Sequence, residues 1–327
     1  MMTMQEQGEL CFPLLANTSC RRTQRDPSTV ALSSILLSAI SLIIFTLNLL
    51  VIISISHFKQ LHTPTNLLLL SLATSDFLVG FLLLFQIFRL DGCWFFGDQI
   101  CIVYYVLNYV IMSVSIGSMV LISVDRYIAI CDSLHYPIKV TLIRVQICVC
   151  LSWSSSLVYN FLCFFNSLKQ PGRSNTCVGE CVIVVTYAVG ITDLFLSFIG
   201  PITVIVVLYM KVFAVAVSQV RAMRSRVGMV TLRDATIKSS ELKAARTLGV
   251  VVVVFIVYIM PYFCIAISAQ DFMLDAASSS VVICLTFFNS CLNPLIYAIF
   301  YPWFRKAMKL IVTLQILKSD SSQMNIM

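Results

Sequence analysis

Seven long apolar stretches follow one another along the 327-residue chain. Each has at least the roughly 20 residues that a helix needs to cross the hydrocarbon core of a membrane. We predict helices, because lipid offers backbone N–H and C=O groups no hydrogen-bond partner outside the segment. The stretches are Val30–Ser56, Thr65–Phe88, Ile100–Ile130, Val145–Phe165, Val182–Ala216, Leu242–Ala269 and Ser278–Phe300. The pattern predicts an all-α membrane protein, a seven-transmembrane helix bundle.

Composition supports this fold class, since 59% of the residues are hydrophobic and only 11% are charged. A soluble domain has about a quarter of charged residues. We expect a tail at residues 1–29, the membrane domain at 30–301, and an eighth helix with a second tail at 302–327. In Tyr301–Ile311, aromatic and aliphatic residues oppose three basic ones, which is typical of an amphipathic helix lying in contact with membrane lipid.

The basic residues predict the orientation. Lys and Arg gather at every second loop, opposite the side of the N-terminus, and such residues are retained in the cytoplasm. We therefore expect a multi-pass plasma-membrane protein with an extracellular N-terminus. The net charge of +7 is then explained by topology. Nothing in the sequence resembles the interleaved basic and aromatic surface of a nucleic-acid groove, so no nucleic-acid partner is expected.

Six of the thirteen cysteines fall on the predicted outer side, where disulfides persist. They are Cys11, Cys20, Cys93, Cys101, Cys177 and Cys181, an even number that is compatible with three bridges. Asn17-Thr18-Ser19 is a glycosylation sequon in the same outer tail, so Asn17 is predicted to carry a glycan.

Polar residues inside the spans are costly and call for a reason. One group, drawn from several spans, consists of Asn48, Asp76, Ser115, Asn289, Ser290 and Asn293. Asn289 and Asn293 are four residues apart and share a helix face. The group predicts either a site for water and a hard monovalent cation such as sodium, or a hydrogen-bonded core without an ion. No other cofactor or metal is expected.

Asp125-Arg126-Tyr127 stands at the inner end of the third span. Arg126 can pair with Asp125 beside it, or with Glu241 at the inner start of the sixth span. A pair that forms when helices approach and breaks when they separate is a bistable element. The competing interpretation is a surface ion pair worth about 0–1 kcal/mol.

These residues, in this order, resemble the rhodopsin-like G protein-coupled receptors. The resemblance rests on one feature in each of the seven spans. They are Asn48, Leu72-Ala73-Thr74-Ser75-Asp76, Asp125-Arg126-Tyr127, Trp153, Pro201, Phe255 with Pro261, and Asn293-Pro294-Leu295-Ile296-Tyr297. The resemblance implies a switch toward a G protein at the third, sixth and seventh spans, with Tyr297 as a member.

Within that class, the segment from Asn289 to Tyr297 followed by Tyr301-Pro302-Trp303-Phe304 is similar to the trace amine-associated receptors. This resemblance implies a small-amine ligand, a stimulatory or olfactory-type heterotrimeric G protein, and an olfactory role with a rise in cyclic AMP. It also implies three disulfides, namely Cys101–Cys181, Cys11–Cys177 and Cys20–Cys93.

The sequence departs from amine receptors where the ligand binds. Such receptors hold the ammonium on an aspartate seven residues after the bridging cysteine of the third span, and this chain has Asn108 there. An acid appears instead in the fifth span, Asp193, eight residues before Pro201. It resembles the replacement counter-ion of a subset of the family abundant in fish. The alternative is a structural acid bonded to a hydroxyl such as that of Ser197.

The aromatic cage for the ammonium is also reduced, because Ile259 replaces the usual Trp and Phe287 the usual Tyr. With one deep carboxylate, the pocket is expected to prefer monoamines with an apolar body over diamines. The expected ligand residues are Asn108, Tyr109, Met112, Asp193, Ser197, Tyr262, Phe263 and Phe287.

Other function classes fit less well. A secondary transporter would show inverted repeats with helices broken at matching positions. A membrane enzyme would need a nucleophile and base or a metal cluster, and all three histidines lie at inner loops. The alternative that stays open is a receptor of the same class for a non-amine small ligand or a peptide.

Overall fold

The computed structural model describes residues 9–22, 26–90, 92–173, 175–183, 185–225, 276–318 and 321–324, with Gly249, Val253, Ile256, Val257, Met260 and Ile326. Within these residues the chain is helical apart from its loops and two isolated β-bridges. Most of the predicted sixth span, Leu242–Ala269, lies outside them.

Five helical segments in the described part are long and apolar enough to cross a membrane. They are α1 (Pro27–His57), α2 (Pro64–Phe88), α3 (Gly97–Cys131), α5 (Leu142–Cys163) and a continuous segment, Tyr187–Val215. That segment comprises α7 (Tyr187–Asp193), η3 (Leu194–Ile199) and most of α8 (Gly200–Ser225). The predicted seventh span is α10 (Ala276–Phe300), a helix with Pro294 inside it.

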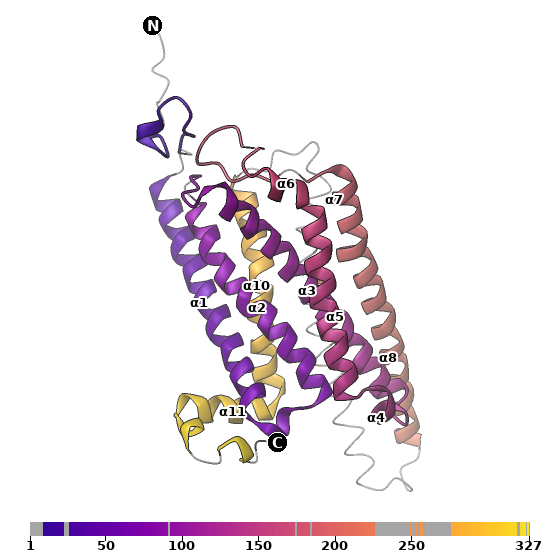
Figure 1. Cartoon of the computed structure of the whole chain (residues 1–327). Coiled ribbons are helices and arrows are strands. Elements are labelled where there is room, and N and C mark those ends of the chain that lie inside the picture. The colour runs from indigo at the N-terminus through magenta and orange to yellow at the C-terminus, as the bar shows by residue number, and fades with distance from the viewer. Residues whose placement is uncertain are drawn as a thin grey trace.

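The long helices lie side by side as one bundle (Figure 1). Helix α3 contacts α2, α5 and α8, and α10 contacts α1 and α2. The N-terminal segment and α6 (Phe165–Lys169) lie at one end of the bundle, which we call the disulfide end. Helices α4 (Tyr136–Lys139) and α11 (Pro302–Val312) lie at the other end, called the α11 end.

Local sequence signals mark where two of these helices begin. The hydroxyl of Thr63 accepts a hydrogen bond from the backbone N–H of Asn66, and Pro64 follows as the first residue of α2. Thr141 caps α5 in the same way, through the N–H of Arg144. Threonine satisfies an N–H group that the first helical turn leaves unpaired, and proline at the first position has none to satisfy.

The outer surface of the bundle is apolar along the helices. Leu32 and Ile35 of α1 are 69% and 68% exposed, and many other large apolar side chains on α5 and α8 are also exposed. A soluble monomer rarely shows so extensive an apolar surface. The surface is therefore the one that faces lipid.

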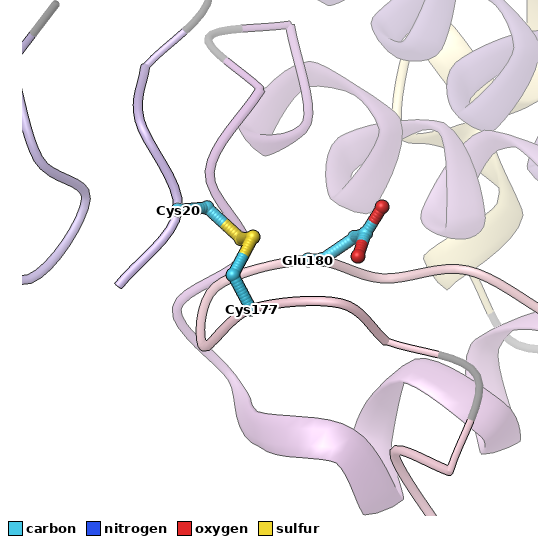
Figure 2. Close-up of side chains that lie close together, drawn as sticks. All are labelled: Cys20, Cys177 and Glu180. Atoms are coloured by element: carbon cyan, nitrogen blue, oxygen red, sulfur yellow. A yellow bond between two sulfur atoms is a disulfide. The ribbon is translucent and has the colours of Figure 1, made fainter. Parts of the chain in front are cut away.

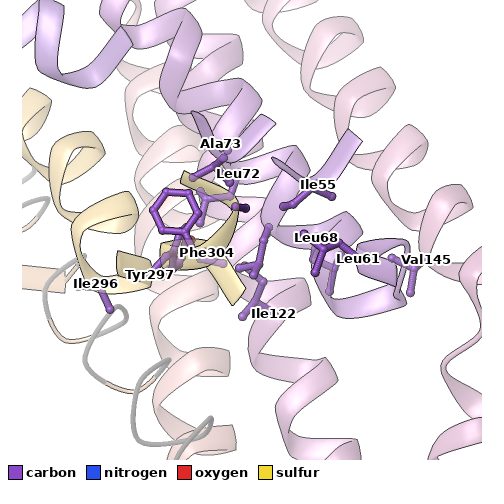
Figure 3. Close-up of a cluster of buried hydrophobic side chains, with 14 of the residues drawn as sticks. Ile55, Leu61, Leu68, Leu72, Ala73, Ile122, Val145, Ile296, Tyr297 and Phe304 are labelled. Atoms are coloured by element: carbon purple, nitrogen blue, oxygen red, sulfur yellow. The ribbon is translucent and has the colours of Figure 1, made fainter. Parts of the chain in front are cut away.

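A buried hydrophobic cluster joins the helices near the α11 end (Figure 3). Ile55 of α1, Leu68 and Leu72 of α2, Tyr297 of α10 and Phe304 of α11 all contribute to it. The side chains of Tyr297 and Phe304 are fully buried. Packing of this kind is what holds membrane helices together, since lipid tails provide no hydrophobic drive between them.

Helix α11 runs across the end of the bundle rather than along it (Figure 1). Phe304 and Ala307 are buried against the bundle, whereas Arg305 and Lys309 of the same helix are exposed. The Arg305 guanidinium donates to the carbonyls of Ala298 and Ile299 at 3.0 and 2.7 Å. It thereby satisfies two carbonyls at the C-terminal end of α10, where a positive charge is favourable.

Candidate ligand site and the polar networks beneath it

Three disulfides close the disulfide end of the bundle. Cys101, in the first turns of α3, is bonded to Cys181 in the loop before α7, as predicted. The other two bridges are Cys11–Cys93 and Cys20–Cys177. The predicted pairs Cys11–Cys177 and Cys20–Cys93 are therefore wrong.

Backbone hydrogen bonds explain the correction. The N–H of Cys11 donates to the carbonyl of Cys20, so these two residues lie side by side. The N–H of Cys20 donates to the carbonyl of Val178, which brings Cys20 against Cys177 and leaves Cys11 for Cys93. Cysteine spacing could not have decided this, because six cysteines allow 15 connectivities.

The Cys20–Cys177 bridge ties the N-terminal tail to the loop, with Glu180 three residues further along that loop (Figure 2). Although these three side chains lie close together, both sulfurs are used in the bridge and are not thiolate ligands. The Glu180 carboxylate accepts hydrogen bonds from the backbone and the hydroxyl of Thr176, at 2.6 and 2.9 Å. It shapes the loop.

A cavity of about 290 Å³ lies inside the bundle beneath this covering. Six of the eight predicted ligand residues line it, namely Asn108, Tyr109, Met112, Asp193, Ser197 and Phe287. The other two, Tyr262 and Phe263, lie outside the described residues. Residues far apart in the sequence, from α3, from the α7–α8 segment and from α10, thus meet around one space.

Asp193 is half-buried and its Oδ1 accepts a hydrogen bond from the hydroxyl of Ser197 at 2.7 Å. Among the described residues, no Lys, Arg or His forms an ion pair with it. The next six residues form a π-helical turn, η3, in which the N–H of Gly200 donates to the carbonyl of Phe195. Pro201 has no N–H and cannot continue the ladder, and π-turns are frequent at functional sites.

The wall formed by α3 carries no charged side chain. The side-chain amide of Asn108 donates to the carbonyl of Tyr104 in its own helix, at 2.8 Å. The ring of Tyr109 lies 5.0 Å from that of Phe164, centroid to centroid. Met112 of α3 and Phe287 of α10 add apolar side chains to the lining. This wall can receive an apolar body and offers no carboxylate.

Five polar residues of the lining were not predicted from the sequence: Ser113, and a group of four near the disulfide loop, Gln86, Arg89, Tyr104 and Tyr105. These four connect to one another and to the disulfide loop: the Tyr104 hydroxyl donates to Gln86 Oε1, and Arg89 and the Tyr105 hydroxyl both donate to the carbonyl of Cys181. Gln86 and Arg89 are three residues apart at the end of α2 and so share one face. Their spacing in the sequence could have predicted this.

Toward the α11 end, the cavity reaches a second group of residues, the predicted polar core. Asp76 is fully buried, and its two carboxylate oxygens accept from the hydroxyl of Ser290 at 2.9 Å and the amide of Asn293 at 2.8 Å. The amide of Asn48 donates to the carbonyl of Ser290 at 3.1 Å. The carboxylate thus joins α2 to α10, and the Asn48 amide joins α1 to α10.

Several oxygens of this core lack a hydrogen-bond partner among the described residues. They are Oδ1 of Asn48, Asn289 and Asn293. Ser115 is buried and lines the cavity, together with Asn289 and Ser290. A buried oxygen without a partner is costly. These atoms, together with Asp76, form an all-oxygen donor set of the kind that hard cations prefer.

At the α11 end, Arg126 lies in a closed network. Its Nε donates to Asp125 Oδ2 at 2.9 Å, and its Nη2 donates to the hydroxyl of Thr65 at 2.6 Å. The same hydroxyl donates to Asp125 at 3.0 Å, and the Tyr136 hydroxyl donates to its other oxygen at 2.8 Å. The side chains of Arg126 and Asp125 are only 12% and 3% exposed, so the interpretation as a surface pair is wrong.

The rest of the predicted switch is seen in part. Tyr297 is fully buried, with its ring centroid 6.0 Å from that of Tyr301, and its hydroxyl has no partner among the described residues. Tyr127 lies under the Lys211 ammonium, 5.8 Å from the ring centroid. Glu241, the other candidate partner of Arg126, lies outside the described residues.

Comparison with known proteins defines the class first. The family described as "7 transmembrane receptor (rhodopsin family)" matches residues 47–297, which is more than half of the chain. A receptor of this family has seven transmembrane helices, in agreement with the fold class predicted from the sequence.

The chain is 39% identical to trace amine-associated receptor 8a of Rattus norvegicus, over 97% of this chain and 96% of the relative. It is 37% identical to trace amine-associated receptor 4 of Mus musculus, over 96% and 94%. It is also 37% identical to trace amine-associated receptor 6 of Homo sapiens, over 97% and 95%. The chain belongs to the trace amine-associated receptors. It is therefore a multi-pass membrane G protein-coupled receptor and not an enzyme.

Proposed function

We propose that this receptor binds a small amine in the 290 Å³ cavity and that Asp193 is the counter-ion of the ammonium. The observation that carries the proposal is a carboxylate that faces the cavity and has no cationic partner among the described residues. An ionised carboxylate inside a membrane bundle costs several kcal/mol unless a cation compensates it.

The alternative of a purely structural Asp193 accounts for only part of the geometry. Ser197 supplies one hydrogen bond to one carboxylate oxygen, but a hydroxyl carries no compensating charge. Both residues line the cavity, so a ligand can reach the carboxylate. An ammonium supplies both the charge and up to three donors.

The cavity also supports the size and the shape of the ligand. Its volume is at the lower limit of small-molecule sites, which are about 300–1,000 Å³, and this favours a small amine over a peptide. Asn108 on α3 is neutral, and Tyr109, Met112 and Phe287 provide an apolar lining. We infer that monoamines with an apolar body are preferred over diamines.

The substitution Asp193→Asn tests the assignment. Truncating one side of a desolvated charge pair costs about 2–5 kcal/mol, so amine potency should fall about 30- to several-thousand-fold. The measurement is a concentration series of monoamines in cells expressing the full chain, with cyclic AMP and surface expression recorded together.

Asp98→Asn is the matched control. Asp98 is exposed at the start of α3, accepts from the Asn175 amide and does not line the cavity. Its loss should leave potency within about threefold, as for other exposed polar contacts. Unchanged amine potency of Asp193→Asn at normal surface expression would contradict the proposal, and a receptor of this class for a non-amine ligand or peptide would then be preferred.

We further infer that the disulfide end faces the exterior and that the receptor raises cyclic AMP through a stimulatory G protein, as in an olfactory-type amine receptor. Three bridges at one end support the orientation, because disulfides persist outside the cytosol. Asn17 is exposed at that end and so available to a glycan. The buried Arg126 network lies at the other end, where a G protein would bind.

An epitope tag at the N-terminus tests the orientation. The tag should be accessible to antibody on intact cells; accessibility only after permeabilisation would reverse the orientation.

A sodium ion at Asp76 is the candidate allosteric ligand. The unpartnered oxygens of Asn48, Asn289 and Asn293 support this choice over a dry hydrogen-bonded core. When bound, the cation would neutralise the carboxylate. Amine binding to membranes should then differ between sodium chloride and potassium chloride at equal ionic strength, by about fivefold or more for a coupling of about 1 kcal/mol. Asp76→Asn should remove the difference; equal binding in both salts without substitution would argue against the ion.

A further inference from the structure

A positive charge shares the cavity with Asp193. Arg89 directly follows the last residue of α2, is half-buried and lines the cavity. Among the described residues, no carboxylate forms an ion pair with its guanidinium. The proposed amine site therefore carries one negative and one positive side chain.

The guanidinium is held in place by groups that are themselves fixed. Its carbon lies 5.2 Å from the ring centroid of Tyr105 and 5.9 Å from that of Tyr104. Its Nη2 donates to the carbonyl of Cys181 at 3.3 Å, and that residue is anchored to α3 by the bridge to Cys101. A guanidinium has five N–H donors, so one carbonyl leaves donors for a ligand.

Two structural roles explain why an arginine stands at this position. A cation is favourable at the C-terminal end of α2, and the bond to Cys181 fastens the loop. Neither role requires the guanidinium to line the ligand cavity. A simple monoamine would leave this charge without a partner, and a diamine would bring a second positive charge toward it. A carboxylate would compensate it in the two-pronged geometry that arginine favours.

We propose that Arg89 forms an anion subsite and that the preferred ligand class is a zwitterion, with its ammonium on Asp193 and a carboxylate on Arg89. This rests on the proposed amine function of Asp193. Arg89 follows the end of α2 and Asp193 ends α7, and these two helices lie on opposite sides of α3 (Figure 1). We expect an α-amino acid, whose two charged groups are bonded to one carbon, to be too short to engage both side chains. The geometry points to ω-amino acids, whose chain would lie along the apolar lining of the cavity.

The test compares straight-chain ω-amino acids of increasing length with their ω-amino carboxamides, which have the same chain and a neutral end. The readout is the potency ratio of acid to amide in cells expressing the full receptor, measured as cyclic AMP with surface expression recorded. At the matching length the acid should be about 10- to 100-fold more potent, as expected for a charge-assisted hydrogen-bonded pair. In Arg89→Gln this ratio should fall to about one.

Arg173→Gln is the matched control. Arg173 is exposed in a loop at the same end of the bundle, donates to Gln170 Oε1 and does not line the cavity. The substitution Arg173→Gln removes one positive charge from that end and should preserve the potency ratio of acid to amide. A ratio near one at every chain length in the unmutated receptor, or an undiminished ratio in Arg89→Gln, would overturn the subsite. If Arg89→Gln fails to reach the surface, the chain-length series in the unmutated receptor still tests the subsite.

The same compounds separate this proposal from the one on which it rests. Asp193→Asn should weaken acid and amide alike, because both present the same ammonium. If it does so while the ratio stays near one in the unmutated receptor, the amine site stands and the anion subsite is wrong. If Asp193→Asn leaves the response to the amide unchanged, the amine counter-ion itself is wrong.

Discussion

The two ends of the bundle treat buried charge in opposite ways. At the α11 end, Asp125 and Arg126 are bonded to each other and to the hydroxyls of Thr65 and Tyr136. Toward the disulfide end, Asp193 keeps a single hydroxyl partner and faces a cavity. Both acids lie in membrane helices, but only one of them has its charge compensated within the described residues.

The difference fits the roles that we propose for the two regions. A charge whose partner is built into the protein can hold helices in one arrangement and release them when the contact breaks. A charge that lacks such a partner within the protein is compensated best by a ligand of opposite charge. The cavity is thus suited to recognition, and the Arg126 network to a conformational switch.

The largest effect that would sharpen this comparison is expected from adding a second negative charge to the cavity. Asn108→Asp places a carboxylate on α3, facing the same space as Asp193. The response to a terminal diamine should rise by about 10- to 100-fold relative to the matching monoamine, because a second ammonium now gains a charged partner. The measurement is the ratio of the two potencies.

Asn108→Leu is the control, since it removes the amide and adds no charge. It should not raise the diamine response. A receptor that already responds to diamines as strongly as to monoamines before any substitution would contradict the idea of a single-counter-ion pocket.

A smaller effect is expected from loosening the network at the α11 end. Thr65→Val keeps the side-chain shape and removes the hydroxyl that bonds to both Arg126 and Asp125. The loss of about 1 kcal/mol should raise the population of the released state, and with it the basal cyclic AMP signal, by about fivefold. Basal signal is measured without ligand and normalised to surface expression.

Thr74→Val controls for the substitution itself. Thr74 lies in the same helix, and its hydroxyl donates to the carbonyl of Leu70 one turn earlier, away from Arg126. Its basal signal should stay at the original level. An equal rise in both variants would show that the effect comes from α2 in general and not from the Arg126 network.

The sequence predicted the membrane helices that the structure describes and the depth of the main polar residues. Long apolar runs specify membrane helices, since the bilayer leaves the backbone few alternatives. Because burying a charge in a membrane is costly, Asp76 and Asp193 can be identified from the sequence alone as residues that need a specific role. The position of Asp125-Arg126 at the end of a span likewise indicated where a switch would lie. All of these signals are local.

Contacts between distant segments were decided only by the tertiary structure. Disulfide pairing in the tail depended on whether Cys11 or Cys20 lies against the loop that carries Cys177, and the backbone bonds of Cys20 settled it. Nothing in the sequence distinguishes Arg89 from other cations near helix ends, and only the packing of α2 in the bundle places it in the lining of the cavity. Thr65 and Arg126 are 61 residues apart, and neither segment by itself predicts the hydrogen bond between them. Each of these outcomes depends on how a helix is rotated against its neighbours, and that rotation is fixed by packing summed over the whole bundle rather than by any one stretch of sequence.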